Sequence, residues 1–292
     1  MKNKMTLSKV IIYLILVVLA AIFVLPMLLV VIVSFTDEFA IGMNGYSFFP
    51  EAWSLDAYSR LFYPGSNVYQ SYAVTIFITI VGTVSAVVIT YLVAYPLANK
   101  QVKYRNGIAL FFFITTVFNA GLVPWYLMCR TLGLYDNIFA LIIPSMIFSP
   151  FNMFLMRNYI ATIPISLMES ARIDGASEVR IAFQIFLPLS KPILATIALF
   201  CGIGYWNSWY NAVMLLNDAD LYPLQMLLFR IQSDIRMLTD LASAGGTDRT
   251  FVPPTESFKM ATVVVTVGPV LLFYPFLQKY IVKGIMIGSI KG

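Results

Sequence analysis

Histidine is absent from this 292-residue chain, and only 11% of its residues are charged. A soluble domain usually carries about 25% charged residues. The missing imidazoles exclude a histidine-based proton relay, and we predict no metal site. The scarcity of charge, together with 60% apolar residues, excludes an ordinary soluble domain, because too much apolar surface would face water. The composition therefore predicts an integral membrane protein.

Charged residues are also missing from six long stretches. These uncharged runs are 10–36, 61–99, 106–129, 137–156, 192–217 and 260–278. A helix needs about 20 apolar residues to cross the hydrocarbon core. We therefore predict an all-α polytopic protein with six transmembrane helices, at about 11–34, 71–97, 107–128, 138–156, 193–214 and 260–280. The first run is longer than a signal-peptide core, so we expect it to remain as a span.

Cysteine is almost absent, since the chain has only Cys129 and Cys201. No disulfide framework is implied, and both residues are predicted to pack inside the bundle.

The machinery that would power transport is missing as well. No Gly-Lys-Ser or Gly-Lys-Thr occurs, so the chain lacks a phosphate-binding P-loop. No ionisable residue lies near the middle of a predicted span, which disfavours an ion-coupled transporter. We expect no catalytic residue and no bound cofactor. Uphill transport would need a separate energy-supplying subunit, whereas a passive channel or a membrane scaffold would look the same at this point.

The basic residues are distributed unevenly across the membrane. Thirteen of the 19 basic residues, but only three of the 14 acidic ones, fall in segments 1–10, 98–106, 157–192 and 278–292. The positive-inside rule makes these segments cytoplasmic and predicts that both termini are cytoplasmic. The net charge of +5 then reflects the inner membrane face and does not indicate nucleic-acid binding.

One cytoplasmic segment, Thr162 to Pro192, is long enough to hold a partner site. Its first helix begins near Pro164, with Ile165, Met168 and Ala171 on one face. Gly175 is predicted to bend the chain. Asp174 is predicted to cap a second helix, which Pro188 and Pro192 end. The apolar face of that second helix is predicted to be Val179, Ala182, Phe183 and Phe186. Periodicity alone fits an interfacial amphipathic helix without a partner equally well.

The residues of this segment resemble the EAA loop of binding-protein-dependent ABC importer permeases. The family pattern is Glu-Ala-Ala, three residues, Gly, then about nine residues to an apolar-x-Leu-Pro. The matching residues here are Glu169, Ser170, Ala171, Asp174, Gly175, Ala176, Leu187 and Pro188. Ser170 stands where the family usually has Ala. The whole chain is similar to MalG-like carbohydrate permeases, and within them to the LplC/YtcP group.

This resemblance implies a type I importer permease with the MetI-like fold, in the bacterial cytoplasmic (inner) membrane. It implies a second, non-identical permease, an ABC ATPase dimer that uses ATP and Mg, and an extracytoplasmic solute-binding protein. Residues 1–70 would hold the first span and an outer loop, and residues 71–292 the transmembrane domain. Within that domain the resemblance implies a coupling loop at 164–189, an outer loop at 217–259 and a cytoplasmic tail at 283–292. The outer loop is the family's candidate for a probe inserted into the binding protein.

The resemblance also implies a carbohydrate substrate, and within that class an oligosaccharide. Sugars are bound by aromatic stacking and by amide or hydroxyl hydrogen bonds. The candidate path residues with such groups are Asn119, Asn152, Tyr205, Trp206, Asn207, Trp209 and Asn211. Interfacial tryptophans and interhelical asparagines are also common without any substrate. Membrane lipid is a further expected partner of the permease. The alternative is a permease for another solute class, or an ion-coupled secondary transporter.

Overall fold

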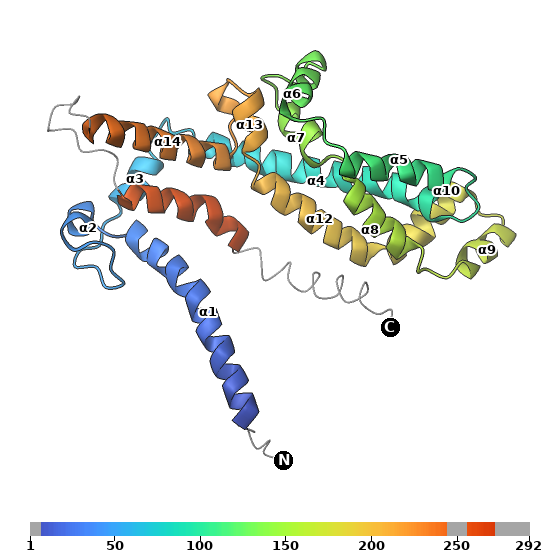
Figure 1. Cartoon of the computed structure of the whole chain (residues 1–292), viewed down its shortest axis with the longest axis horizontal. Coiled ribbons are helices and arrows are strands. Elements are labelled where there is room, and N and C mark those ends of the chain that lie inside the picture. The colour runs from blue at the N-terminus through green and yellow to red at the C-terminus, as the bar shows by residue number, and fades with distance from the viewer. Residues whose placement is uncertain (1–6, 244–255, 272–292) are drawn as a thin grey trace. The chain divides into compact units, whose positions relative to one another are not determined.

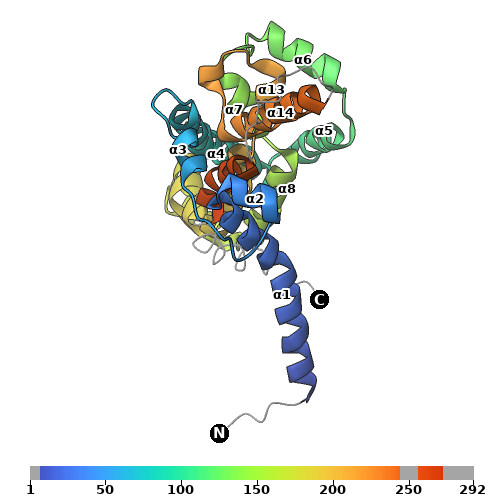
Figure 2. The same ribbon diagram turned by 90° about the vertical axis from the view of Figure 1, so that its left-hand side faces the viewer.

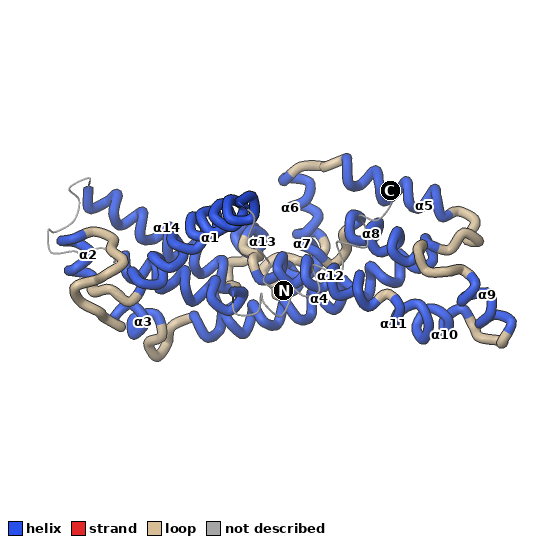
Figure 3. Tube along the Cα trace, turned by 90° about the horizontal axis from the view of Figure 1, so that it is seen from below, coloured by secondary structure: helices blue, strands red, loops and turns tan. Residues whose placement is uncertain are grey.

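The computed structural model describes residues 7–243 and 256–271. Over these residues the chain is built of helices and loops without a β-strand, and one isolated bridge pairs Thr36 with Trp53 (Figure 3). The predicted all-α class is confirmed. The chain forms two compact units: Met1–Val68 with Leu228–Pro269 (unit one), and Tyr69–Leu227 with Val270–Gly292 (unit two).

Unit one holds the first predicted span and the segments that follow it (Figure 1). Its elements are α1 (Leu7–Ser34), α2 (Glu38–Asn44), α3 (Asp56–Leu61), α14 (Leu224–Ser243, from residue 228) and a helix at 256–271. The most apolar window of α1 buries none of its residues inside the chain. A helix that is apolar all round and uncovered by its own chain needs lipid or another subunit around it.

Unit two holds the remaining elements. They are α4 (Val68–Ala98), α5 (Arg105–Val117), α6 (Leu122–Thr131), α7 (Phe139–Met146), α8 (Pro150–Ile160), α9 (Ser166–Ile173), α10 (Glu178–Arg180), a π-helix (Ile181–Phe186), α11 (Leu187–Leu189), α12 (Lys191–Trp206), α13 (Tyr210–Leu215) and a 3₁₀ turn (Ala219–Leu221). One buried cluster joins the second half of α4 to α8, α9, the π-helix and α12. Another joins the first half of α4 to α6, α7 and α13. Both cysteines are free and buried in these clusters, as predicted.

Three of the six predicted spans are broken rather than continuous. The span at 107–128 divides into α5 and α6, and the chain direction is bent by 117° between them (Figure 2). The break contains Gly121, whose φ is +89°, and the Asn119 side chain accepts a hydrogen bond from its N–H at 2.9 Å. The side chain of Asn119 therefore competes with the helical hydrogen bonds, and Gly121 permits the turn.

The span at 138–156 divides into α7 and α8. Ser149 is extended, as the residue before a proline prefers to be, and its hydroxyl accepts from the Asn152 N–H at 3.4 Å. The span at 193–214 divides into α12 and α13 at residues 207–209.

Fewer of the described helices than predicted are long and apolar enough to span a membrane without a break. Two helices in the described residues, α1 and α4, are long and apolar enough to cross a membrane. Up to four spans result if each strongly bent pair, α5 with α6 and the segment Glu178–Leu189 with α12, counts as one. The predicted sixth span at 260–280 is described only to residue 271, within the helix at 256–271. The outer-loop tip and the tail 283–292 lie outside the described residues.

Candidate functional site

The predicted coupling loop lies at one end of unit two, away from α13 (Figures 1 and 3). In α9, Met168 and Ala171 are buried in the cluster formed with α4, α8 and α12, while Glu169 and Ser170 are exposed. Ile165 was predicted to share the buried face, which is wrong, because it lies at the helix start and is exposed. Two adjacent residues of the Glu-Ser-Ala triplet thus face outward, and the third holds the helix to the core.

The end of α9 explains why glycine stands at position 175. The Ala176 N–H donates to the Ala171 carbonyl at 2.9 Å, and the Gly175 N–H donates to the Arg172 carbonyl at 3.0 Å. This pair of bonds is the Schellman motif, which requires a left-handed residue after the helix cap. Gly175 has a φ of +76° and Asp174 is the cap. The predicted bend is therefore confirmed.

The second helix of the loop differs from its prediction. Ser177 caps it, accepting from the Arg180 N–H at 3.3 Å, so the assignment of that cap to Asp174 is wrong. Asp174 is instead the C-terminal cap of α9, and Gly175 and Ala176 lie between it and Ser177. The signal was present in the sequence, because Ser177 precedes the acidic Glu178, a common pattern at helix starts.

A π-helix follows, and it changes which residues are buried. The Leu187 N–H donates to the Ala182 carbonyl five residues back. Pro188 has no N–H to offer and its ring crowds the preceding turn, which favours this widening. Ile181, Ala182 and Phe186 are buried, whereas Val179 and Phe183 are exposed, so the predicted apolar face is only half right.

The prolines do not end this helix as predicted. Pro188 and Pro192 lie at the first turns of α11 and α12, where a missing N–H is tolerated. The direction changes by 76° at Ser190 instead.

Side chains of α4 hold the π-helix from the other side. The Tyr91 hydroxyl donates to the buried Ala182 carbonyl at 2.6 Å. The Tyr95 ring meets the Phe186 ring edge-on, with centroids 5.5 Å apart. Tyr91 is 91 residues from Ala182, so no local sequence pattern could have found this contact. The loop is therefore attached to the longest helix of unit two.

Charged groups connect the two arms of the bend. Arg172 donates from Nε to Glu178 Oε1 at 2.7 Å, across Gly175. It also donates from a terminal nitrogen to Gln101, in the loop after α4. The Glu178 hydrogen bond raises the pKa of Arg172, so the guanidinium is charged at all physiological pH values. The Glu169 carboxylate forms no hydrogen bond or ion pair with any described residue, and the residue's backbone N–H donates to the Ile165 carbonyl at 3.1 Å.

Exposed apolar side chains lie on each side of the bend. Ile173 is 86% exposed and Val179 is 67% exposed, one on each side of the bend. Sequence analysis missed both as site residues. An exposed acidic group together with exposed aliphatic residues, beside a bend fixed by Gly175, can dock into a cleft of another protein.

The candidate path residues fall into two groups. Asn152 and Tyr205 are buried: the Asn152 amide donates to Cys201 Sγ at 3.6 Å, and the Tyr205 hydroxyl donates to the Ile142 carbonyl at 2.9 Å. Their polar groups hold neighbouring helices together. Trp206 is half-buried, and Asn207 Oδ1 accepts a hydrogen bond from Gln225 Nε2 at 3.1 Å.

The other group lies near the breaks after α5 and α12. Asn119 and Asn211, far apart in sequence, line one pocket. The Trp209 ring is exposed and meets Tyr210 edge-on, with centroids 6.0 Å apart. The structure thus brings together part of the predicted set.

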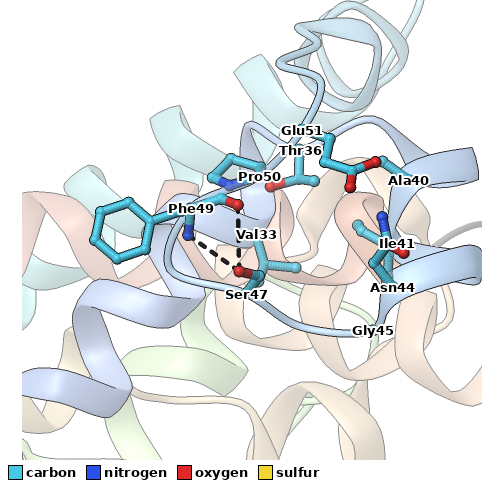
Figure 4. A pocket seen from close by; sticks show the side chains of 10 residues that line it. All are labelled: Val33, Thr36, Ala40, Ile41, Asn44, Gly45, Ser47, Phe49, Pro50 and Glu51. Atoms are coloured by element: carbon cyan, nitrogen blue, oxygen red, sulfur yellow. Dashed lines mark hydrogen bonds between the residues drawn. The ribbon is translucent and has the colours of Figure 1, made fainter.

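A second, smaller pocket lies in unit one, after α1. It has a volume of about 130 Å³ and includes Ser47 and Glu51 in its lining (Figure 4). The Ser47 hydroxyl donates to the Phe49 carbonyl at 3.3 Å and accepts from the Phe49 N–H at 3.1 Å. Its polar group is therefore used within the loop.

Comparison with known proteins agrees with this geometry. Residues 65–287 match the family of binding-protein-dependent transport system inner membrane components. The chain belongs to this family. It is an ABC importer permease subunit rather than an enzyme, and the resemblance that the EAA loop indicated is confirmed. The alternative of an ion-coupled secondary transporter is excluded.

Individual relatives match over nearly the whole permease. Protein LplC of Bacillus subtilis (strain 168) is 41% identical over 93% of this chain and 90% of its own length. The polygalacturonan/rhamnogalacturonan transport system permease protein YtcP of the same organism is 38% identical over 100% of both chains.

A solved structure supports the same fold. It is a chain of a bacterial ABC transporter involved in the import of the acidic polysaccharide alginate. The two chains superpose with a TM-score of 0.81 at 32% identity, covering 96% of this chain and 99% of that one.

Proposed function

We propose that this permease imports an oligosaccharide and docks its ATPase through the bend between α9 and α10. The observation that carries the docking proposal is the division of α9: Met168 and Ala171 are buried in the core, while Glu169 and Ser170 are exposed beside Gly175. The residues proposed to form the docking surface and its support are Glu169, Ser170, Ala171, Asp174, Gly175, Ala176, Leu187 and Pro188. Glu169 would pair with a basic residue of the ATPase.

The contacts of the loop suit it to transmit a force from the ATPase to the helices of the permease. Arg172 and Glu178 tie its two arms together, and Tyr91 ties the π-helix to α4. A force applied at the bend would therefore move α4 and α12 as well. Closure of the ATPase dimer on ATP and Mg would rock the permease between inward-facing and outward-facing states, a two-state change biased by nucleotide.

The membrane arrangement completes the proposal. Six spans, with both termini in the cytoplasm, agree with the distribution of basic residues. Residues 1–70 and 71–292 would be the two parts of the chain, with a second, unlike permease, two ATPase subunits and an extracytoplasmic binding protein as partners. The outer loop 217–259 would approach the binding protein, and the tail 283–292 the ATPase.

Carbohydrate is the proposed substrate because the similar permease YtcP belongs to a polygalacturonan/rhamnogalacturonan transport system, and the similar solved structure is involved in the import of the acidic polysaccharide alginate. Asn119, Trp206, Asn207, Trp209 and Asn211 would face the path. Asn152 and Tyr205 would position the helices that form it.

Uptake by the reconstituted complex tests this function. Proteoliposomes with both permeases, the ATPases and the binding protein should accumulate labelled oligogalacturonides when ATP is supplied inside the compartment that corresponds to the cytoplasm. Amino acids and short peptides serve as the control solutes. ATP-dependent uptake of those solutes, without uptake of any oligosaccharide from a plant or algal polymer panel, would refute the carbohydrate assignment.

A further inference from the structure

We propose that unit two contains a subsite for the uncharged face of a sugar ring, located between α6 and α13. This inference rests on the proposed carbohydrate import. The pocket has a volume of about 320 Å³ and is lined by Asn119, Gly121, Leu122, Trp125, Tyr210 and Asn211. That volume lies at the lower end of the range of small-molecule sites, about 300–1,000 Å³.

Two helix breaks converge on this pocket. Asn119 and Gly121 belong to the break between α5 and α6, and Tyr210 and Asn211 directly follow the break between α12 and α13. Non-helical backbone within a membrane protein is tolerated where it lines a cavity. Interrupted helices are also the usual sites of substrate binding in transporters. The meeting of two breaks at one pocket therefore indicates a ligand site.

The pocket offers aromatic walls. The rings of Trp125 and Tyr210 have centroids 6.1 Å apart and an interplanar angle of 39°. Such rings present flat apolar faces to the C–H face of a sugar, and each also carries a polar group at its edge. Sequence analysis singled out neither residue, because Trp125 lies 85 residues from Tyr210 and follows no sugar-binding pattern.

Unused hydrogen-bonding groups surround these walls. Asn119 is oriented by the bond from the Gly121 N–H to its Oδ1, which leaves its amide N–H₂ for a ligand. The Trp125 indole N–H and the Tyr210 hydroxyl form no hydrogen bond with any described residue. Asn211 is held by its bond to the Ala140 carbonyl at 3.5 Å and contributes to the buried wall. Sugar hydroxyls are the natural partners for such a mixture of donors and acceptors.

Charge decides which sugar face fits. None of the six lining residues is an aspartate, glutamate, lysine, arginine or histidine. A uronate carboxylate placed here would lose water without gaining a cationic partner, which is costly. The subsite should therefore bind an uncharged ring face or an esterified uronate better than a free uronate.

Cysteine protection in the full complex tests the subsite. Leu122→Cys places a thiol in the lining, and Val123→Cys, on the same helix but outside the lining and 66% exposed, is the matched control. The native Cys129 and Cys201 are buried, so their labelling background should be low. The probes are trigalacturonate and its methyl ester, with a water-soluble maleimide as the labelling reagent.

The expected result is slower labelling of Leu122→Cys with the ester, weaker protection with the free acid, and no effect of either sugar on Val123→Cys. Unchanged labelling of Leu122→Cys in vesicles that take up trigalacturonate would overturn the subsite but leave the importer function intact. Stronger protection by the free acid would overturn the preference for an uncharged face. Vesicles that import no oligosaccharide would refute the proposed function and the subsite together.

A kinetic measurement makes the same test without cysteine. Trp125→Leu should raise the KM for uptake of the ester about three- to tenfold, because stacking is lost while the overall fold is kept. Trp125→Phe, which keeps a ring, should recover most of that loss. Equal KM values for all three permeases, at equal membrane levels, would contradict the subsite.

Discussion

Gly82 of α4 is a residue whose missing side chain shapes the permease. A Cβ atom there would lie 2.5 Å from the Tyr205 ring, closer than real atoms approach. That ring cannot easily move, because its hydroxyl is bonded to the Ile142 carbonyl. Gly82 therefore sets how closely α4 and α12 pack.

Replacing this glycine should destabilise the protein. Gly82→Ala is expected to lower the free energy of unfolding by about 1–3 kcal/mol, the usual cost of overpacking a core. Gly107→Ala is the control, since a Cβ at Gly107 meets nothing within 4 Å, and alanine there should be neutral or stabilising by about 0.5–1 kcal/mol. Thermal unfolding of the purified variants measures both. Equal melting temperatures for Gly82→Ala and Gly107→Ala would contradict this account of the α4–α12 packing.

Sequence analysis succeeded at single residues where a local rule applies. Gly175 was predicted as the bend because only glycine readily accepts the required backbone conformation, and the structure agrees. Tyr205 was chosen for its sugar-binding chemistry, yet its hydroxyl is bonded to a carbonyl 63 residues away. No pattern in the sequence reports a partner at that distance.

At the scale of elements, the start of the helix at 256–271 is held by α2. Glu38 accepts hydrogen bonds from the Glu256 and Ser257 backbone N–H groups at 2.9 and 3.0 Å, so it caps a helix more than 200 residues away. Glu256 in turn accepts from Lys259 and from the Tyr46 hydroxyl, each at 2.6 Å. This group joins the segment after α1, which is predicted to lie outside, to the last described helix.

The stability of this group should depend on pH. Burial alone would raise the pKa of Glu256, but the Lys259 and Tyr46 hydrogen bonds outweigh it and lower the pKa below its usual value. A lowered folded-state pKa means that the stabilisation is present above about pH 4.5 and is lost as the pH falls through the folded pKa. The same contact raises the pKa of Tyr46 to about 12, so Tyr46 stays protonated throughout the neutral range.

Glu256→Gln is the matched variant for this dependence, because it keeps the shape and removes the charge. The wild-type permease should lose more melting temperature than Glu256→Gln between about pH 6 and about pH 3, a range that extends below the unfolded pKa. Parallel loss in the two proteins would show that Glu256 does not contribute to acid sensitivity.

The predicted spans show what charge spacing can and cannot report at this scale. Uncharged runs correctly indicated the apolar segments, and α1 and α4 are continuous helices as predicted. Run length does not report continuity, so the breaks around Asn119, Ser149 and Asn207 were missed. The Asn-Ala-Gly and Ser-Pro sequences at the first two breaks were available signals. The π-helix depends on Pro188 together with Tyr91 from another helix, and was not predictable locally.

For the whole molecule, orientation in the membrane is the clearest prediction. Ala161→Cys, in the segment predicted to be cytoplasmic, should react with a membrane-impermeant maleimide only after the membrane is opened. Phe49→Cys, in the outer segment and at a position 89% exposed, should react in intact cells. Reaction of Ala161→Cys in intact cells, with protection of Phe49→Cys, would reverse the proposed topology.

At this scale the family could be predicted because the EAA loop is a local pattern with fixed spacing. The sugar subsite could not, because it depends on two helix breaks meeting at one pocket. The number of spans rests on charge runs and on helices of which only part is described, and labelling of each loop would establish it.

The most direct test of the central claim compares Gly175→Asp with Gly175→Asn. Aspartate and asparagine have the same shape and tolerate a positive φ about equally, so the pair differs in charge at the proposed docking surface. Affinity purification of the tagged permease should recover the second permease with both variants. It should recover the ATPase with Gly175→Asn and lose it, together with sugar uptake, with Gly175→Asp, because an added carboxylate at the bend would lose water on docking without a basic partner of its own. Full ATPase recovery and normal uptake with Gly175→Asp would contradict the docking of the ATPase on this bend.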